Sequence, residues 1–184
     1  ALVGLKHENL KKASKALKQK EKILIPKIEP KTGNFLKNTS FVHLHNHTQF
    51  SVLQATSRIN QLIDTAAKDG MPALAITDHG NLMGAFHFIK AINLYNSKLE
   101  DREKKLKPII GCEFYVCEDH KDKTRRDDGF QIVFIAKNKK GYHNLAKMTS
   151  IAYVDGFYYV PRIDKKIVDL YKENLIVLTG NTFG

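Results

Sequence analysis

Residues 71–99, "MPALAITDHGNLMGAFHFIKAINLYNSKL", contain the pattern that decides the fold. The short apolar run "MPALAIT" is typical of a strand that is buried on both faces. It ends in two ionisable residues, Asp78 and His79, and the segment from Asn81 onward has a helical pattern. A strand followed directly by a helix is the repeating unit of α/β folds, in which ligands gather where the strands end.

The alternation of strands and helices continues on both sides of this stretch. The further expected strands are 41–47, 107–117, 130–136 and 174–180, and the further expected helices are 57–70, closed by Gly70, and 139–154. A polar, charged loop is expected at 118–129. We therefore predict an α/β fold with a mainly parallel sheet, either open or closed into a barrel.

The basic charge is concentrated at the start of the chain. Residues 1–40 hold ten lysines and three glutamates, a formal charge of +7 out of the +11 of all 184 residues. We expect a basic helix and linker in 1–39, ahead of one domain in 40–184. The lysines suit either attraction to phosphate polyanions or a solvated helix and linker.

Other features of the composition point to a cytoplasmic protein. No window approaches the roughly 18 consecutive apolar residues of a membrane span, so no membrane association is expected. Cys112 and Cys117 match neither a zinc motif nor a disulfide framework, which suits a reducing compartment.

Three histidines, His43, His45 and His47, occupy alternate positions in "FVHLHNHTQFS", residues 41–51. Alternate residues of a strand face the same way, so two such imidazoles can tip toward one ion at Zn–N distances of about 2.0–2.1 Å. The alternative is a strand that carries surface histidines without a ligand.

His79, which follows a buried strand, and Glu113 strengthen the metal hypothesis. Glu113 interrupts an apolar strand, and a buried carboxylate needs a partner such as a metal ion. The alternatives are that Glu113 faces solvent on an edge strand and that Asp78 caps the following helix. Together, His45, His47, His79 and Glu113 would lie at the ends of three consecutive strands, and we predict that they bind metal.

Several motifs carry a resemblance to a known family. They are "HNHTQFS" (45–51), "ALAITDHGNLMGA" (73–85), "KPIIGCEFYV" (107–116), "GYHNLAKM" (141–148) and "GFYYVPRID" (156–164). From about Phe41 onward, the chain resembles the PHP (polymerase and histidinol phosphatase) domain at the front of bacterial DNA polymerase III alpha subunits. The resemblance implies a distorted (β/α)7 barrel with up to three metals at the C-terminal ends of its strands. This chain would cover roughly the first two-thirds of it, with the last strands beyond Gly184.

The resemblance assigns roles to individual residues. His45 and His47 match the family's HxH motif, whereas His43 is an outlying residue of the same segment. Glu113 matches the glutamate that bridges two metals, and His79 keeps a third metal position.

The chain departs from the family pattern at three expected ligand positions, which hold Gln54, Gln131 and Asn181. Neutral amides are poor zinc ligands compared with imidazole or thiolate. The resemblance therefore implies one partial site for a divalent ion such as Zn or Mn, or a lost site. The possible surrounding residues of that site are Asp78, His43, Gln54, Gln131 and Asn181.

Three functional hypotheses follow. The first is a structural platform with a degenerate metal site within a DNA-directed DNA polymerase, a Mg-dependent nucleotidyltransferase of DNA replication. Its partners would be the rest of the polymerase chain, a proofreading exonuclease domain or subunit, and DNA through the full-length protein. The second is an active metal-dependent 3′–5′ exonuclease or other phosphoesterase. The third is a free-standing enzyme like histidinol phosphatase. Under each of them, we expect Arg162 and Asp164 to be structural.

Overall fold

The computed structural model describes residues 40–100 and 105–179, within the unit Ser40–Gly184. The predicted basic helix and linker lie outside the described residues, so the division of the chain at residue 39 stays a prediction. In the two described ranges, no helix has the length and apolar character needed to cross a bilayer.

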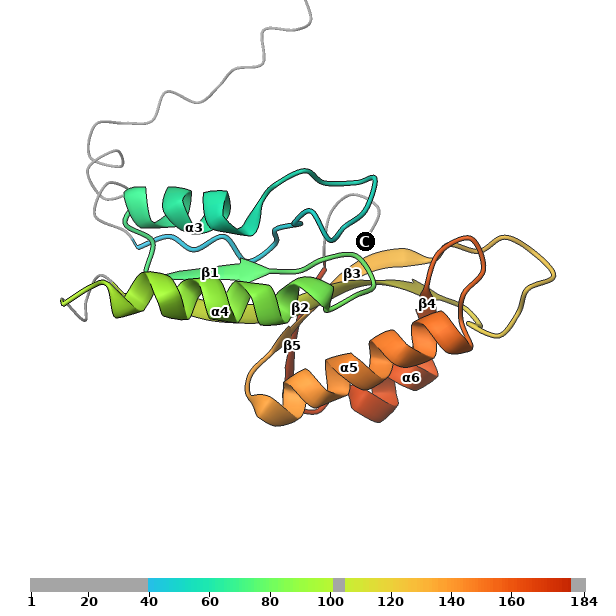
Figure 1. Ribbon diagram of the computed structural model, residues 1–184. Coiled ribbons are helices and arrows are strands. Elements are labelled where there is room, and N and C mark those ends of the chain that lie inside the picture. The colour runs from blue at the N-terminus through green and yellow to red at the C-terminus, as the bar shows by residue number, and fades with distance from the viewer. Residues whose placement is uncertain (1–39, 101–104, 180–184) are drawn as a thin grey trace, which may run out of the picture. The chain divides into compact units, whose positions relative to one another are not determined.

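The described part is a mixed α/β structure, as predicted (Figure 1). Its helices are α3 (Ile59–Lys68), α4 (Met83–Ser97), α5 (Lys139–Val154) and α6 (Lys165–Tyr171). Its strands are β1 (Ala73–Ile76), β2 (Lys107–Cys117), β3 (Phe130–Ala136), β4 (Arg162–Asp164) and β5 (Leu175–Leu178). The short elements β4 and α6 were not predicted.

The helices form where apolar spacing and caps agree. In α3, Ile59, Ile63 and Ala66 are buried at helical spacing, and Gly70 follows with a φ of 67°, which ends the helix as predicted. At the start of α5, the Asn138 side chain accepts a hydrogen bond from the Gly141 N–H at 3.1 Å.

The sheet has the order β1-β2-β3-β5, and β4 also pairs with β2. The pairings of β1 and β4 with β2 are parallel, but those of β2 with β3 and of β3 with β5 are antiparallel. The expectation of a mainly parallel sheet was therefore wrong for two of the four pairings. The loop 118–129 contains no helix, and without a crossover helix the chain reverses into an antiparallel neighbour.

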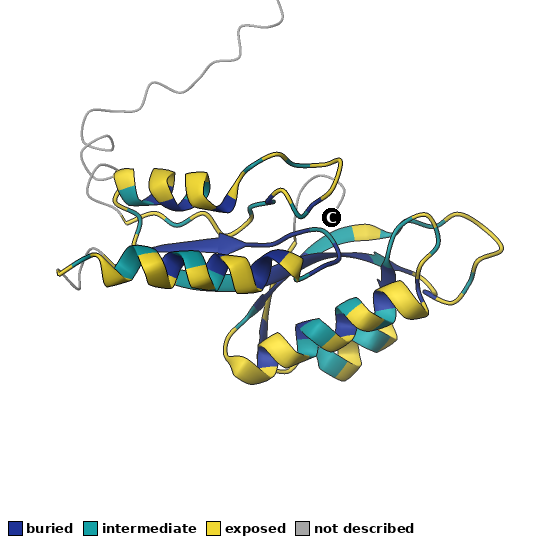
Figure 2. Cartoon of the chain, viewed as in Figure 1, coloured by how far each residue is buried: buried dark blue, intermediate teal, exposed yellow. Residues whose placement is uncertain are grey.

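Two hydrophobic clusters hold the helices against the sheet. The first joins α3 and α4 to β1 through Ile63, Leu74 and Phe88, and Ile110 of β2 packs against it. The second joins α5 and α6 to the other strands, with Cys112 and Phe114 of β2 at its centre. Figure 2 shows β1 as buried, a buried run in β2, and exposed residues on the outer faces of the helices.

The histidine segment, residues 41–47, is not a strand, which corrects the sequence prediction. It runs beside β1, where Ala75 donates its N–H to the His43 carbonyl and Thr77 donates its N–H to the Asn46 carbonyl. The segment advances three positions, from His43 to Asn46, while the neighbouring chain advances two, from Ala75 to Thr77, so a regular ladder cannot form. The Asn46 side chain compensates by donating to the Ala75 and His43 carbonyls at 3.0 and 3.2 Å.

Candidate metal centre

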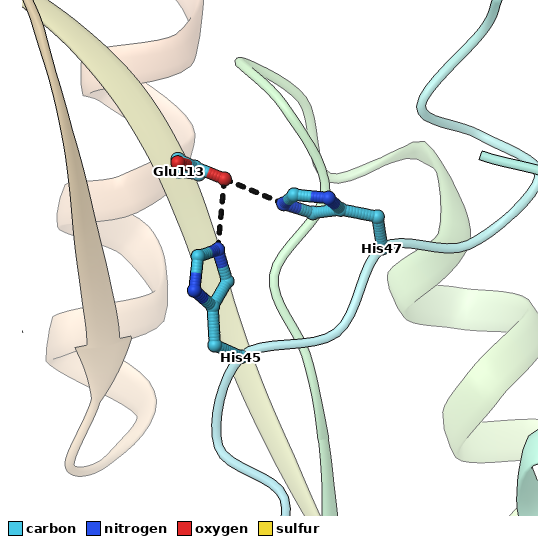
Figure 3. Close-up of side chains that lie close together, drawn as sticks. All are labelled: His45, His47 and Glu113. Carbon is cyan, nitrogen blue, oxygen red and sulfur yellow. Dashed lines mark hydrogen bonds and ion pairs between the residues drawn. The ribbon is translucent and has the colours of Figure 1, made fainter. Parts of the chain in front are cut away.

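The four residues predicted to bind metal meet around one oxygen atom, Oε2 of Glu113. His45 Nε2 lies 2.9 Å from it, His47 Nε2 lies 2.5 Å from it, and His79 Nδ1 lies 3.5 Å from it. Figure 3 shows His45 and His47 directed at the same oxygen from one segment of the chain. The structure therefore brings together side chains that lie up to 68 residues apart in sequence.

Glu113 is fully buried, so the alternative of a solvent-facing residue on an edge strand is wrong. It lies within β2 and not at its end, but it follows the last β1–β2 pair, Ile76 with Ile110. There the Glu113 N–H donates to the Asp78 carbonyl at 3.0 Å, and the Gly80 N–H donates to the Glu113 carbonyl at 2.7 Å. Glu113 is thus fixed beside the end of β1, where His79 emerges.

Asp78 is buried and anchors the histidine segment. Its carboxylate accepts the Thr48 N–H at 2.6 Å, the Thr48 hydroxyl at 2.8 Å and the Ser51 hydroxyl at 2.7 Å. It does not cap α4, since the Met83 N–H donates to Asn81 Oδ1 instead. Asp78 therefore positions the residues that follow His45 and His47.

Thr48 and Ser51 were missed as site residues. Both hydroxyls are buried, and their partner is the carboxylate of Asp78. The available signal was their spacing directly after the paired histidines, in "HNHTQFS". Hydroxyl residues that fix a ligand segment act as outer-shell partners of a metal site.

The protonation states favour cation binding. Burial acts to raise the pKa of Glu113, but the hydrogen bonds from His47 and His45 outweigh it and hold the pKa below the ordinary value. Burial, aided by the neighbouring His47, lowers the pKa of His79. A carboxylate beside a neutral imidazole is the pair of states that metal ligation requires.

Two buried polar atoms in the described residues lack a hydrogen-bond partner, His79 Nδ1 and Glu113 Oε1. Buried polar atoms are almost always paired, so this cluster is incomplete as a purely protein-made network. Ligand atoms of His45, His47 and Glu113 lie within 4.8 Å of one another, and imidazole and carboxylate are ligand types that Zn²⁺ accepts. His45, His47 and Glu113 fit one divalent ion, and His79 Nδ1 lies beside this group at 3.5 Å from Glu113 Oε2.

The remaining predicted residues have other contacts or lie outside the described residues. Gln54 donates to the Tyr115 hydroxyl at 3.4 Å, and Gln131 pairs with Tyr115 across β2 and β3. The ring of His43 packs edge-on against Phe41, with centroids 4.8 Å apart. Asn181 lies outside the described residues.

Arg162 and Asp164 have structural contacts, in line with the prediction. Asp164 caps α6 by accepting the Ile167 N–H at 3.0 Å, and it binds His120 Nδ1 at 2.7 Å. Asp119, His120 and Asp164 also form a second group of metal-type ligands, which the sequence did not reveal. The direct contact of His120 with Asp164 already pairs its two buried members.

The fold and the cluster define a class, the α/β domains that gather histidines and a carboxylate beside a strand end. The family model of the PHP domain matches residues 43–184, and the chain belongs to this family. It is 42% identical over 145 residues to the DNA polymerase III subunit alpha of Chlamydia pneumoniae, and 42% identical over 140 residues to that of Borreliella burgdorferi.

These alignments cover 77% and 74% of this chain, respectively, and 11% of each relative, so the chain spans about a tenth of their length. Among solved structures, an amidohydrolase from Chromobacterium violaceum is similar, at 21% identity and a TM-score of 0.41. That likeness covers 60% of this chain and 32% of the other.

The lowered pKa of His79 gives a pH prediction for the metal-free chain. Because its pKa is depressed below 6.5 on folding, neutral His79 contributes stability that is fully present above about pH 6.5. That stability is lost as the pH falls through the folded-state pKa. Urea unfolding in EDTA at pH 7.5, 6.5 and 5.5 should show this decline.

A matched pair of variants isolates the contribution of His79. His79→Gln should flatten the dependence between pH 6.5 and 5.5, and His143→Gln, on the exposed side of α5, should leave it unchanged. An identical slope in wild type and His79→Gln would contradict the assignment.

Proposed function

We propose that this chain is the PHP region of a bacterial DNA polymerase III alpha subunit, serving as a structural platform around one divalent ion. The observation that carries the proposal is the identity of 42% over 145 residues to such a subunit. Its partners are the rest of the polymerase chain, a proofreading exonuclease domain or subunit, and DNA bound by the complete protein in the cytoplasm. Mg²⁺-dependent nucleotide addition belongs to other parts of that protein.

The proposed ion would be held by His45, His47, His79 and Glu113. Bound there, Zn²⁺ or Mn²⁺ supplies positive charge to the buried carboxylate and links ligands from separate segments. Residues 41–47, which carry His45 and His47, do not form a strand, so a shared ion would fix this segment to β2. This contribution to stability is the basis of the structural role.

The neighbouring amides favour one ion over two. Metal-assisted phosphoester hydrolysis generally uses two ions about 3.5–4 Å apart, and a second ion needs its own anionic or imidazole ligands. At the corresponding positions this chain has Gln54 and Gln131. The alternative function, a metal-dependent 3′–5′ exonuclease or phosphoesterase, is favoured by the cleft of about 220 Å³ that opens beside His79.

Metal content and hydrolysis, measured on one preparation, test the proposal. We expect about one ion per chain by elemental analysis. We also expect no hydrolysis of 3′-mismatched DNA above the level of Glu113→Gln. In the full-length protein, Glu113→Gln should lower the melting temperature but leave nucleotide incorporation per folded molecule unchanged. Two or three ions, with hydrolysis that Glu113→Gln abolishes, would establish the alternative.

A further inference from the structure

The residue between the two paired histidines has contacts of its own. Asn46 separates His45 from His47 in the sequence. The rings of both histidines reach Glu113 Oε2, at 2.9 and 2.5 Å. The Asn46 side-chain amide instead donates a hydrogen bond to the Ala75 carbonyl of β1 at 3.0 Å. Asn46 therefore ties the segment to β1 at the point between its two candidate ligands.

The main chain of Asn46 is held by a single threonine, Thr77. The Asn46 N–H donates to Thr77 Oγ1 at 2.9 Å, and the Thr77 hydroxyl donates to the Asn46 carbonyl at 3.1 Å. The Thr77 N–H donates to the same carbonyl at 2.8 Å. Thr77 is fully buried, and hydrogen bonds in such a low-dielectric environment are stronger than in water. The peptide groups that join the two histidines are thus fixed to the end of β1.

The methyl branch of Thr77 lies against β2. A Cβ atom at Gly111 would lie 2.8 Å from Thr77 Cγ2, so a side chain at position 111 would displace this methyl group. Gly111 precedes Glu113 by two residues in β2, and alternate residues of a strand share a face. Through its two branches, Thr77 therefore connects the main chain between the histidines with the strand that carries Glu113.

These contacts bear on the free energy of ion binding. Fixing a backbone in one conformation costs conformational entropy, and residues 41–47 do not form a strand that would fix them. If the ion alone ordered the two imidazoles, that cost would be subtracted from its affinity. Hydrogen bonds that order the segment beforehand remove the cost from the binding step.

We propose that Asn46 and Thr77 are positioning residues of the candidate metal centre. They hold His45 and His47 in place before an ion binds. Their hydrogen bonds go to main-chain groups, so they act on the ligands through the backbone. The effect on the ion rests on the proposed metal function, whereas the ordering of the metal-free segment does not.

Thr77→Val tests the hydroxyl group, because valine keeps the branched shape and removes only the side-chain hydrogen bonds. We expect Zn²⁺ affinity, measured by competition with a chromophoric chelator, to fall about tenfold or more, as for other outer-shell partners. The visible absorption of bound Co²⁺, which reports ligand geometry, should change too. Thr77→Ser retains the hydroxyl and should restore both readouts. The matched control Thr149→Val removes a hydroxyl that donates within α5, and should leave both unchanged.

Asn46→Asp tests the side-chain amide by the sign of its effect. Aspartate has the same shape, but its carboxylate would face the Ala75 and His43 carbonyls, to which the amide donates. Positioning predicts weaker Zn²⁺ binding, although an added negative charge by itself attracts cations. Tighter binding would overturn the role of Asn46. Circular dichroism verifies that each variant folds, and this variant carries the test if Thr77→Val does not.

Amide hydrogen exchange in EDTA separates the positioning role from the ion. Thr77→Val should speed exchange at the Asn46 N–H, which loses its acceptor, and Thr149→Val should not. Faster exchange in Thr77→Val, together with a wild-type chain that binds no Zn²⁺, would refute only the metal function. Unchanged exchange at Asn46, or unchanged Zn²⁺ affinity in Thr77→Val when the wild type binds the ion, would overturn the proposal.

Discussion

Replacing Arg162 with methionine is expected to lower the free energy of unfolding by about 3–5 kcal/mol, a large share of the stability of a domain this size. Arg162 is fully buried. Its guanidinium donates to the backbone carbonyls of Gly156 at 3.1 Å, Asp127 at 2.9 Å, Asp122 at 2.9 Å and His120 at 3.3 Å. Methionine fills similar space but leaves these carbonyls without their donor.

The control for this prediction is Arg125→Met, which removes the same charge at the surface. The Arg125 side chain is 66% exposed and pairs with Glu118, itself 77% exposed. Exposed pairs of this kind contribute little, so Arg125→Met should change stability by less than about 0.5 kcal/mol. Urea unfolding followed by circular dichroism measures both variants, and equal losses would mean that the buried hydrogen bonds of Arg162 are not what stabilises the fold.

Glu113→Gln is expected to weaken Zn²⁺ binding by at least about 100-fold. Outer-shell partners of a metal site already contribute about 10- to 100-fold to affinity, and Glu113 is the residue to which the histidines converge. Glutamine keeps the shape of the side chain but removes its negative charge. Competition with a chromophoric chelator at pH 7.5 measures the affinity directly.

Glu118→Gln provides the matched control for this metal measurement, because it neutralises an exposed carboxylate in the loop after β2. It should bind Zn²⁺ like wild type. If the two variants bind the ion equally well, the cluster around Glu113 is not the metal centre. If metal-free Glu113→Gln is folded, its lower affinity for Zn²⁺ is due to the missing ligand charge and not to unfolding.

The central residues of the site could be predicted because ionisable side chains are unexpected within or directly after buried apolar strands. Glu113 stands within an apolar strand, and His79 follows a buried one, so each residue signals a requirement that the strand itself does not meet. The two residues lie close together because β1, which precedes His79, and β2, which contains Glu113, are neighbouring parallel strands. Apolar spacing and turn residues, in contrast, located most helices and strands.

The shape of the histidine segment could not be predicted, because alternation in "FVHLHNH" fits a strand. Its irregular path depends on Asn46, whose side chain replaces missing ladder bonds, and on the buried carboxylate of Asp78. Both contacts reach about 30 residues along the chain. Local periodicity carries no information about them.

The hydrogen-bond partners of Arg162 could not be predicted from the sequence either. The guanidinium donates to four backbone carbonyls, which any residue type offers, so no sequence pattern marks them. The strand that contains Arg162 has three residues, too few for a period of two to be recognised. The antiparallel return of β3, in contrast, was detectable from the helix-free loop before it.

The passage of β2 through both hydrophobic clusters has a kinetic consequence. Ile110 packs with one cluster, whereas Cys112 and Phe114, the neighbours of Glu113 in β2, belong to the other, so β2 joins two regions that can condense separately. His45 and His47 contact Glu113 from the segment 41–47, whereas Glu113 itself is positioned by the pairing of β2 with β3. We therefore expect ion capture to follow the folding transition state, so that the ion slows unfolding and leaves the refolding rate almost unchanged.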